Sequence, residues 1–186
     1  MKAATVAVGS MIGVMFMGST IVTPLYALYA RQFDFSAVVL TLIYAAYVIG
    51  NLASLFFFGG VSDRAGRRRI VLRALILAAV STSIFFFATS TPWLFVARAL
   101  SGFSIGLAAG AGTAWIAELD SGADKARAAL VAVVGNFAGI ALGPLISGLL
   151  AEYTPWPLHL PFLIYIAIVA VTAVFIARSP ETVSGS

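Results

Sequence analysis

The sequence contains no cysteine and a single histidine among its 186 residues. The first absence excludes disulfide bonds and thiolate metal sites, and one imidazole cannot build a metal centre alone. No aspartate or glutamate lies deep in any long apolar run, and no cluster of His, Asp or Glu occurs within these runs. We therefore predict that the protein is not an enzyme and that it carries no cofactor and no metal.

Charge is also scarce, because 10% of the residues are charged while 61% are apolar. Soluble domains contain roughly 25% charged residues, and a mean hydropathy of +1.05 is too high for a surface that faces water. The composition predicts an all-α membrane protein surrounded by the lipid bilayer. The net charge of +4 does not indicate nucleic-acid binding, since the basic residues fall in short loops and form no stripe.

Six apolar segments approach the length, about 20 residues, that a helix needs to cross the hydrocarbon core. Their approximate bounds are 5–30, 36–58, 70–89, 91–116, 128–151 and 161–177. We predict that residues 1–186 form one bundle of six transmembrane helices.

Basic residues lie almost entirely on one side of these segments. Nine of them fall in the loops and ends of one side, against Arg31 on the other. Loops rich in lysine and arginine stay on the cytoplasmic side of a membrane. The pattern predicts a multi-pass protein of a bacterial-type inner membrane, with both termini in the cytoplasm.

The loop between the second and third segments is short, strongly basic and punctuated by glycine. Its residues with notable spacing are Gly59, Asp63, Arg64, Gly66, Arg67 and Arg68. A glycine permits a tight turn, an aspartate suits the positive end of a helix, and arginines can bind carboxylates with two nitrogens each. A basic loop of this kind fixes topology whether or not it has a further role.

Two later segments carry patterned residues of their own. The fourth contains Arg98 and Gly102, and the fifth contains Gly139, Gly143, Pro144 and Gly148. An arginine at the centre of an apolar helix costs roughly 2.5–3.5 kcal/mol on insertion scales. Arg98 therefore either faces a wet cavity or a partner, or extends toward the outer headgroups. Pro144 is expected to kink its helix, and glycines four apart allow another helix to approach closely.

These three motifs resemble those of the major facilitator superfamily of secondary transporters. The loop resembles the superfamily's loop between helices 2 and 3 at every fixed position, and the fourth segment resembles its helix 4 motif, with Ser101 where glutamine is common. The fifth segment resembles the helix 5 motif of the antiporter branch. The resemblance implies the N-terminal six-helix half of a larger fold, built as a 3+3 inverted repeat. It also implies that Arg98 takes part in proton coupling and that helix 5 packs on helix 8 of a second half.

Polar residues near and inside the segments supply further candidates. The resemblance implies that an acid after the fourth segment pairs with a loop arginine, which makes Arg67 with Glu118 the first expectation and Asp120 the rival; two solvated acids are the alternative. Candidates for a transport pathway are Thr20, Thr23, Asn51 and Asn136. Threonine also bonds to its own helix backbone, so both interpretations of the threonines stay open.

Glycine is distributed unevenly among the segments. It is absent from residues 70–89 and 161–177, and it recurs every four residues in the fourth and fifth segments. Small residues at this period mark faces where helix backbones approach closely. We therefore predict that the first, fourth and fifth helices pack inside the bundle, that the third and sixth face lipid, and that Gly106 and Gly139 lie in close interhelical contacts.

Together these features predict a module of a secondary active transporter. We expect proton-coupled efflux of small molecules by alternating access, with a second half supplied by another copy of the chain or by a complementing six-helix chain. The alternative is a truncated or interaction-only membrane subunit without transport of its own. The sequence does not identify the substrate.

Overall fold

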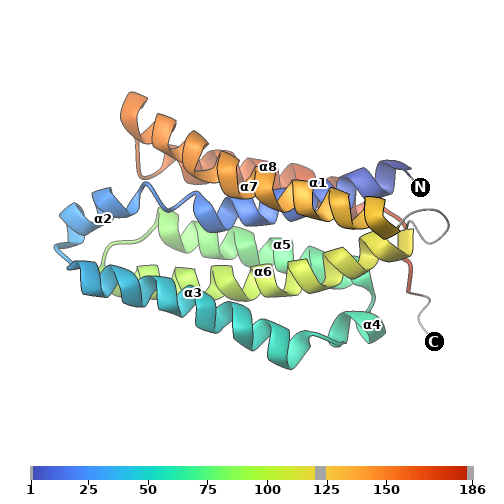
Figure 1. The fold of residues 1–186 in the computed structure, drawn as a ribbon. Helices are drawn as coiled ribbons and strands as arrows, with labels where there is room; N and C mark the ends of the chain where they lie inside the picture. Colours follow the sequence, from blue (N-terminus) through green and yellow to red (C-terminus); the bar gives the residue numbers. More distant parts are fainter. Residues whose placement is uncertain (1, 120–124, 184–186) are drawn as a thin grey trace.

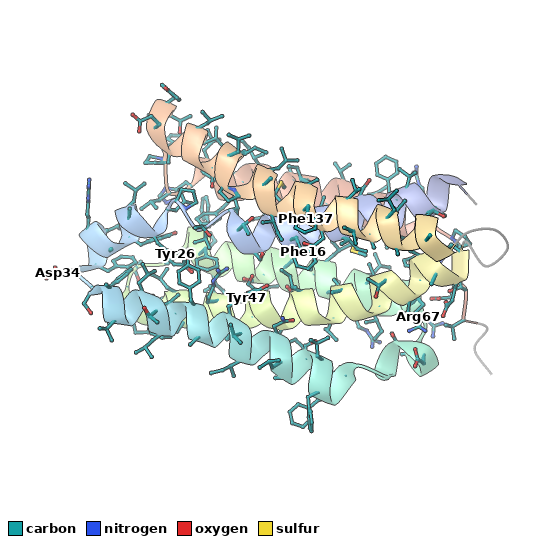
Figure 2. All side chains as sticks on the ribbon, in the orientation of Figure 1. Phe16, Tyr26, Asp34, Tyr47, Arg67 and Phe137 are labelled. Carbon is teal, nitrogen blue, oxygen red and sulfur yellow. The ribbon has the colours of Figure 1, made fainter. Side chains whose placement is uncertain are left out.

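The structure, a computed structural model, describes residues 2–119 and 125–183. Its helices, in chain order, are α1 Lys2–Thr20, α2 Tyr26–Phe33, α3 Ala37–Phe58, α4 Val61–Ala65, α5 Arg67–Phe86, α6 Thr91–Leu119, α7 Lys125–Tyr153 and α8 Leu160–Ala177. The long helices run side by side as a bundle, and both chain termini lie at the end that also holds α4 (Figure 1). We call this end the motif end. Arg67 marks it in Figure 2, where Asp34 lies at the opposite end.

Five of the described helices are long and apolar enough to cross a membrane: α3, α5, α6, α7 and α8. Each lies within three residues of the bounds expected from the sequence. The prediction of one continuous first helix over residues 5–30 is wrong, since α1 ends at Thr20 and α2 begins at Tyr26. Pro24 explains the break, because it has no N–H to donate to the preceding turn and its ring crowds that turn.

Helices α1 and α6 occupy the middle of the bundle. Helix α6 packs against α3, α5 and α1, while α1 packs against α7, α6 and α8. The side chain of Trp115 in α6 is fully buried, and so are Val8 and Met11 in α1. The core is therefore built around α1 and α6, two helices that pack against each other although they are far apart in sequence.

Two glycine seams bring helix backbones together. In the first, α7 meets α1, and a Cβ added at Gly139 would collide with the backbone oxygen of Gly13. In the second, α6 meets α3, and a Cβ added at Gly102 would collide with the backbone oxygen of Tyr47. Gly106 lies in the same seam, against the backbone oxygen of Asn51. The expected close contacts of Gly106 and Gly139 are thus present.

Burial within the chain does not follow the predicted division into inner and lipid-facing helices for α7 and α5. In the apolar span of α7 only 11% of the residues are buried, against 44% in α5, although α5 lacks glycine. The seam buries one narrow face of α7, whereas the larger side chains of α5 interlock with α6 and α8. Glycine therefore reports how closely two backbones approach and not how much of a helix is covered. Helix α8 is intermediate, with 33% buried.

Candidate functional site

The motif loop folds into the short helix α4 followed by a sharp turn at Gly66. This residue has φ +94°, a backbone conformation that disfavours side chains. A Cβ at Gly66 would also press on the carboxylate of Glu181. The turn ends α4 and starts α5 in the next residue, so that Asp63 and Arg67 become neighbours across it. Gly59 is the C-cap residue of α3, and Arg64 lies in α4.

Arg67 joins three elements at the motif end. Its Nη2 and Nε donate to Oε1 of Glu118 in α6 at 2.8 and 3.1 Å, and its Nη1 forms an ion pair with Asp63 in α4. The residue is 8% exposed. The structure therefore forms the pair of Arg67 with Glu118 that the sequence predicted, while the rival Asp120 lies outside the described residues.

Glu181, which sequence reasoning missed, completes this cluster. Its carboxylate accepts hydrogen bonds from the backbone N–H groups of Arg67 at 2.9 Å and Arg68 at 3.1 Å. Helix α5 opens on three arginines and has no acid in its first turn. A carboxylate is favourable at the positive N-terminal end of a helix, and arginines there are unfavourable. The three arginines at the start of α5 therefore indicate that an acid from another segment lies nearby.

Residues 179–182, which follow α8, accept or donate further hydrogen bonds in the same cluster. Arg68 donates to the carbonyl oxygen of Ser179 at 3.2 Å, and Trp115 Nε1 donates to that of Pro180 at 3.2 Å. The hydroxyl of Thr182 donates to the second oxygen of Glu118. One network thus connects α4, α5, α6 and residues 179–182.

Arg98 forms a second arginine site, inside the bundle. It is 3% exposed, and its Nη1 donates to the backbone oxygen of Ser19 at 2.6 Å. In an unbroken helix that oxygen would accept from the N–H of Thr23, which here donates to Thr20 at 2.9 Å. The break between α1 and α2 therefore leaves the Ser19 carbonyl without its helical donor, and Arg98 donates to it instead.

Three tyrosine rings surround the same guanidinium. Its carbon lies 4.7 Å from the ring centre of Tyr47, 5.2 Å from that of Tyr44 and 5.8 Å from that of Tyr26. Figure 2 labels Tyr26 and Tyr47 in the part of the bundle that lies between Asp34 and Arg67. Ring faces attract cations by roughly 0.5–2 kcal/mol, more when water is excluded. The tyrosines come from α2 and α3, after the break, and the carbonyl that Arg98 binds comes from α1, before it, so the whole site spans both sides of the break.

No acid in the described part of the chain pairs with the charge of Arg98. Among the described residues Arg98 forms no ion pair with a carboxylate, and its Nε has no hydrogen-bond partner. The buried hydroxyl of Tyr26 also has no partner. Burying a charge without a counter-charge is costly, and inside membrane proteins such residues mark functional sites.

The remaining predicted residues are placed less decisively. Thr20 donates to the carbonyl oxygens of Phe16 and Met17, both at 3.2 Å, which is the local role left open by the sequence. Thr23 lies in the turn between α1 and α2. Asn136 in α7 has a buried Oδ1 without a partner. Asn51 lies in the seam between α3 and α6.

The glycine face of α7 has a different neighbour from the one expected. Gly139 lies against Gly13, and Gly143 lies against Met17 and Thr20. A Cβ added at Gly148 would lie 3.9 Å from Cγ of Pro24. The expectation that Gly139–Gly148 packs on a second half is therefore wrong, because α1 of the same chain covers this face. Pro144 lies inside a continuous α7, and Ser147 donates to the carbonyl of Gly143 at 2.9 Å.

Residues 8–185 match the model of the Major Facilitator Superfamily. The chain belongs to this superfamily. It is 27% identical over 172 residues to Multidrug resistance protein 2 of Bacillus subtilis (strain 168), covering 91% of this chain and 42% of that protein. It is 28% identical over 139 residues to Quinolone resistance protein NorA of Staphylococcus aureus (strain Mu50 / ATCC 700699), covering 74% of this chain and 35% of that protein.

Solved structures show the same fold. The human organic anion transporter MFSD10 (TETRAN) superimposes with a TM-score of 0.75 at 22% identity, covering 97% of this chain and 48% of that one. A bacterial homologue of the human lysosomal transporter Spinster, in an inward-facing and unoccupied conformation, gives 0.71 at 15% identity, covering 98% and 44%. The chain thus spans less than half the length of these relatives and structures.

Proposed function

We propose that this chain is one half of a secondary active transporter that exports small molecules by alternating access. The membership of the superfamily and the resemblance to drug-resistance proteins support this proposal. The proposal that drug-like compounds are exported rests on the names of those relatives. The proposal of proton coupling rests on the motif that contains Arg98. Both are proposals for this chain.

The observation that carries the proposal is the buried, unpaired charge of Arg98 at the break of the first helix. Transporters of this kind place their sites where a membrane helix is discontinuous and releases backbone groups. Here the break releases the Ser19 carbonyl, and the arginine bound to it lacks an acidic partner among the described residues. A cation held in this way can respond to a carboxylate that loses its proton, or to another anionic group, when that group enters its surroundings.

Another copy of this chain and a complementing six-helix unit are the candidates for the second half. The exposed helices on the two flanks, α3 and α7, are the surfaces available to it, with 17% and 11% of their apolar spans buried. Phe56 and Phe57 in α3 and Phe137 in α7 are exposed large side chains. The excess of basic residues in the loops of one side supports an inner-membrane protein with both termini in the cytoplasm, and the motif end would then face the cytoplasm.

In this orientation the Arg67 cluster is a candidate lock. It closes the cytoplasmic end by bonds among α4, α5, α6 and residues 179–182, and each of these bonds can be broken without unfolding a helix. An alternating-access cycle requires such an end to open and close.

Everted vesicles from the cells that make the protein test the proposal, because they retain any second half. Export of a quinolone and of ethidium would be measured after acidifying the lumen, for the wild type, Arg98→Met, Arg98→Lys and the exposed control Arg31→Met. We expect Arg98→Met to lose transport at least tenfold, Arg98→Lys to lose less, and Arg31→Met to match the wild type. Normal transport by folded Arg98→Met would contradict the proposal.

The same assay on the purified chain alone in liposomes distinguishes the partners. Transport by the chain alone indicates a homo-oligomer, and transport in the native vesicles alone indicates a complementing chain. If neither preparation transports either probe, the interaction-only alternative takes the place of the transport proposal.

A further inference from the structure

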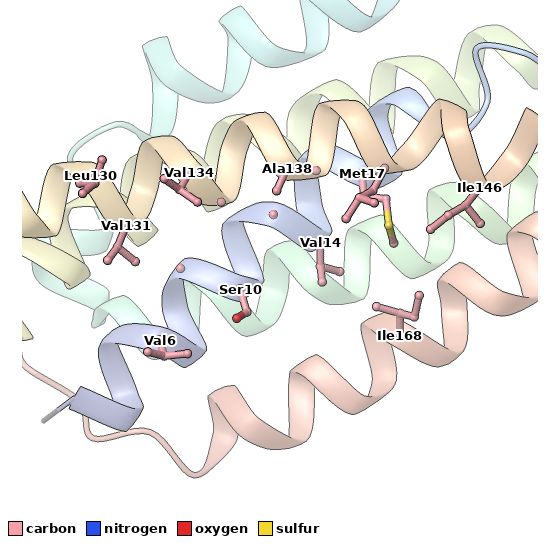
Figure 3. Close-up of a pocket in the computed structure, with 15 residues that line it drawn as sticks. Val6, Ser10, Val14, Met17, Leu130, Val131, Val134, Ala138, Ile146 and Ile168 are labelled. Carbon is pink, nitrogen blue, oxygen red and sulfur yellow. The ribbon is translucent and has the colours of Figure 1, made fainter.

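An apolar groove runs along the outside of α1, between α7 and α8 (Figure 3). Its volume is about 610 Å³, within the range of roughly 300–1,000 Å³ found for ligand sites. All but one of the lining side chains are apolar, the exception being Ser10. The groove exists because the glycine seam holds α7 close to α1, whereas α7 and α8 contact each other little. Ile168 of α8 forms its far wall.

The groove is at least as long as one leaflet of a bilayer. At a helical rise of 1.5 Å per residue its lining extends for about 16 Å along α1, from Val6 to Met17, and for about 24 Å along α7, from Leu130 to Ile146. The hydrocarbon core of a membrane is roughly 30 Å thick, so one leaflet supplies about 15 Å of acyl chain. The groove therefore begins near the motif end, continues past the middle of α7 and has room for the full length of one acyl chain.

Basic residues stand at that end of all three helices that line the groove. Lys2 lies at the start of α1, Lys125 and Arg127 lie in the first turn of α7, and Arg178 follows α8. We call these four the basic rim. Val6 is about one turn from Lys2, and Leu130, also in the lining, is three residues from Arg127. Arg178 is exposed and forms no ion pair among the described residues.

The opposite end of the same helices has a different charge. Glu152 lies near the end of α7, and no lysine or arginine occurs in α7 or α8 beyond Arg127. Charge complementarity therefore favours an anionic group at one end of the groove, and the apolar lining favours a hydrocarbon chain in the rest.

We propose that the groove binds one acyl chain of an anionic phospholipid whose phosphate lies at the basic rim. Basic residues at the membrane surface attract anionic lipids. A bound chain would fill the space between α7 and α8 and would support the seam between α7 and α1 from outside. This site is separate from the Arg98 and Arg67 sites, since it involves neither residue.

Filling the groove tests the position of the chain. Ala138 is exposed and lines the groove, whereas Ala141, three residues further along α7, is exposed outside it. Ala138→Phe should displace the lipid, and Ala141→Phe is the matched control for an added ring on the same helix. The protein would be purified in mild detergent, given equal amounts of phosphatidylglycerol and phosphatidylcholine, and examined by native mass spectrometry.

We expect the wild type and Ala141→Phe to retain one phosphatidylglycerol that Ala138→Phe loses at least fivefold. Neutralising the rim with Lys125→Gln, Arg127→Gln and Arg178→Gln should remove the preference for phosphatidylglycerol over phosphatidylcholine. Arg31→Gln, at the other end of the bundle, should keep it.

Three results would overturn the proposal. The first is equal lipid retention by the two alanine variants, and the second is no preference between the two lipids in the wild type. The third is that tetraphenylphosphonium displaces the lipid from the wild type and from Ala141→Phe but does not bind to Ala138→Phe. The groove would then be a binding site for an apolar cation. Circular dichroism of each variant checks that loss of lipid does not follow from loss of fold.

Discussion

Arg67 and Arg98 are both nearly buried, at 8% and 3% exposure, yet their charges are met in different ways. Arg67 sits at the motif end between the carboxylates of Asp63 and Glu118, with a third from Glu181 on its backbone. Arg98 sits inside the bundle, with one carbonyl and three aromatic rings. The first arrangement satisfies the charge within the chain, and the second leaves it able to interact with something else. Under the proposed function, we therefore expect a structural or gating role for Arg67 and a role in transport for Arg98.

The largest expected effect on stability is that of Glu118→Ala. The change leaves the guanidinium of Arg67 without its main partner, and hydrogen bonds to charged groups contribute roughly 1.5–3 kcal/mol. Because Glu118 is partly exposed, we expect a loss of about 2 kcal/mol in the free energy of unfolding, measured by denaturant unfolding in detergent. Glu152→Ala, which removes an exposed acid outside any described ion pair, serves as the control and should change it by less than about 0.5 kcal/mol.

Glu181→Gln should have a smaller effect in the same direction. The amide keeps one oxygen that can accept from the N–H groups at the start of α5. It loses the negative charge, which interacts favourably with the positive end of the helix dipole and with the three arginines. Charge at a helix end is worth roughly 0.3–1 kcal/mol, up to about 2 when partly buried, so we expect a loss of about 1 kcal/mol. If the loss equalled that of Glu118→Ala, the ranking of the two acids around Arg67 would be wrong.

Tyr47→Leu should cost about 0.5–1 kcal/mol, because the nearest ring of the Arg98 cage is lost. A double-mutant cycle with Arg98→Met isolates this term, since the tyrosine should contribute less once the cation is gone. Equal effects of Tyr47→Leu in both backgrounds would show that the rings pack without stabilising the charge.

The smallest expected effect on stability is that of Arg98→Met itself. Replacing this buried charge by an apolar side chain of similar size removes its desolvation cost, which offsets the loss of the bond to the Ser19 carbonyl and of the ring contacts. We expect the free energy of unfolding to fall by no more than about 0.5 kcal/mol, or to rise. A loss comparable to that of Glu118→Ala would remove the difference between the two arginines.

The sequence predicted the parts of the structure that depend on local pattern and charge. The long apolar runs gave the spans, and an acid at the end of one helix near a basic loop gave the pair of Arg67 with Glu118. Both rest on features that are visible in single segments. The function of the residues at these sites stays a prediction.

The features that the sequence did not predict depend on what surrounds a residue. The effect of Pro24 on the first helix was missed because proline is tolerated in many membrane helices, and the break here is stabilised by Arg98 from another helix. Glu181 lies beyond the last span, and its contact with α5 follows from the bundle bringing the two ends together. The exposure of α7 was missed because a glycine pattern describes one face of a helix and is silent about the rest.

The most direct measurement of the difference between the two arginines is made on one preparation of Arg98→Met. Its free energy of unfolding and its proton-driven transport would be measured together, each relative to the wild type and normalised to the amount of folded protein. We expect transport to fall at least tenfold while the free energy of unfolding changes by less than about 0.5 kcal/mol, as replacement of an unpaired buried charge implies. Full transport would contradict the functional role of Arg98, and a parallel loss of stability would show that its role is structural.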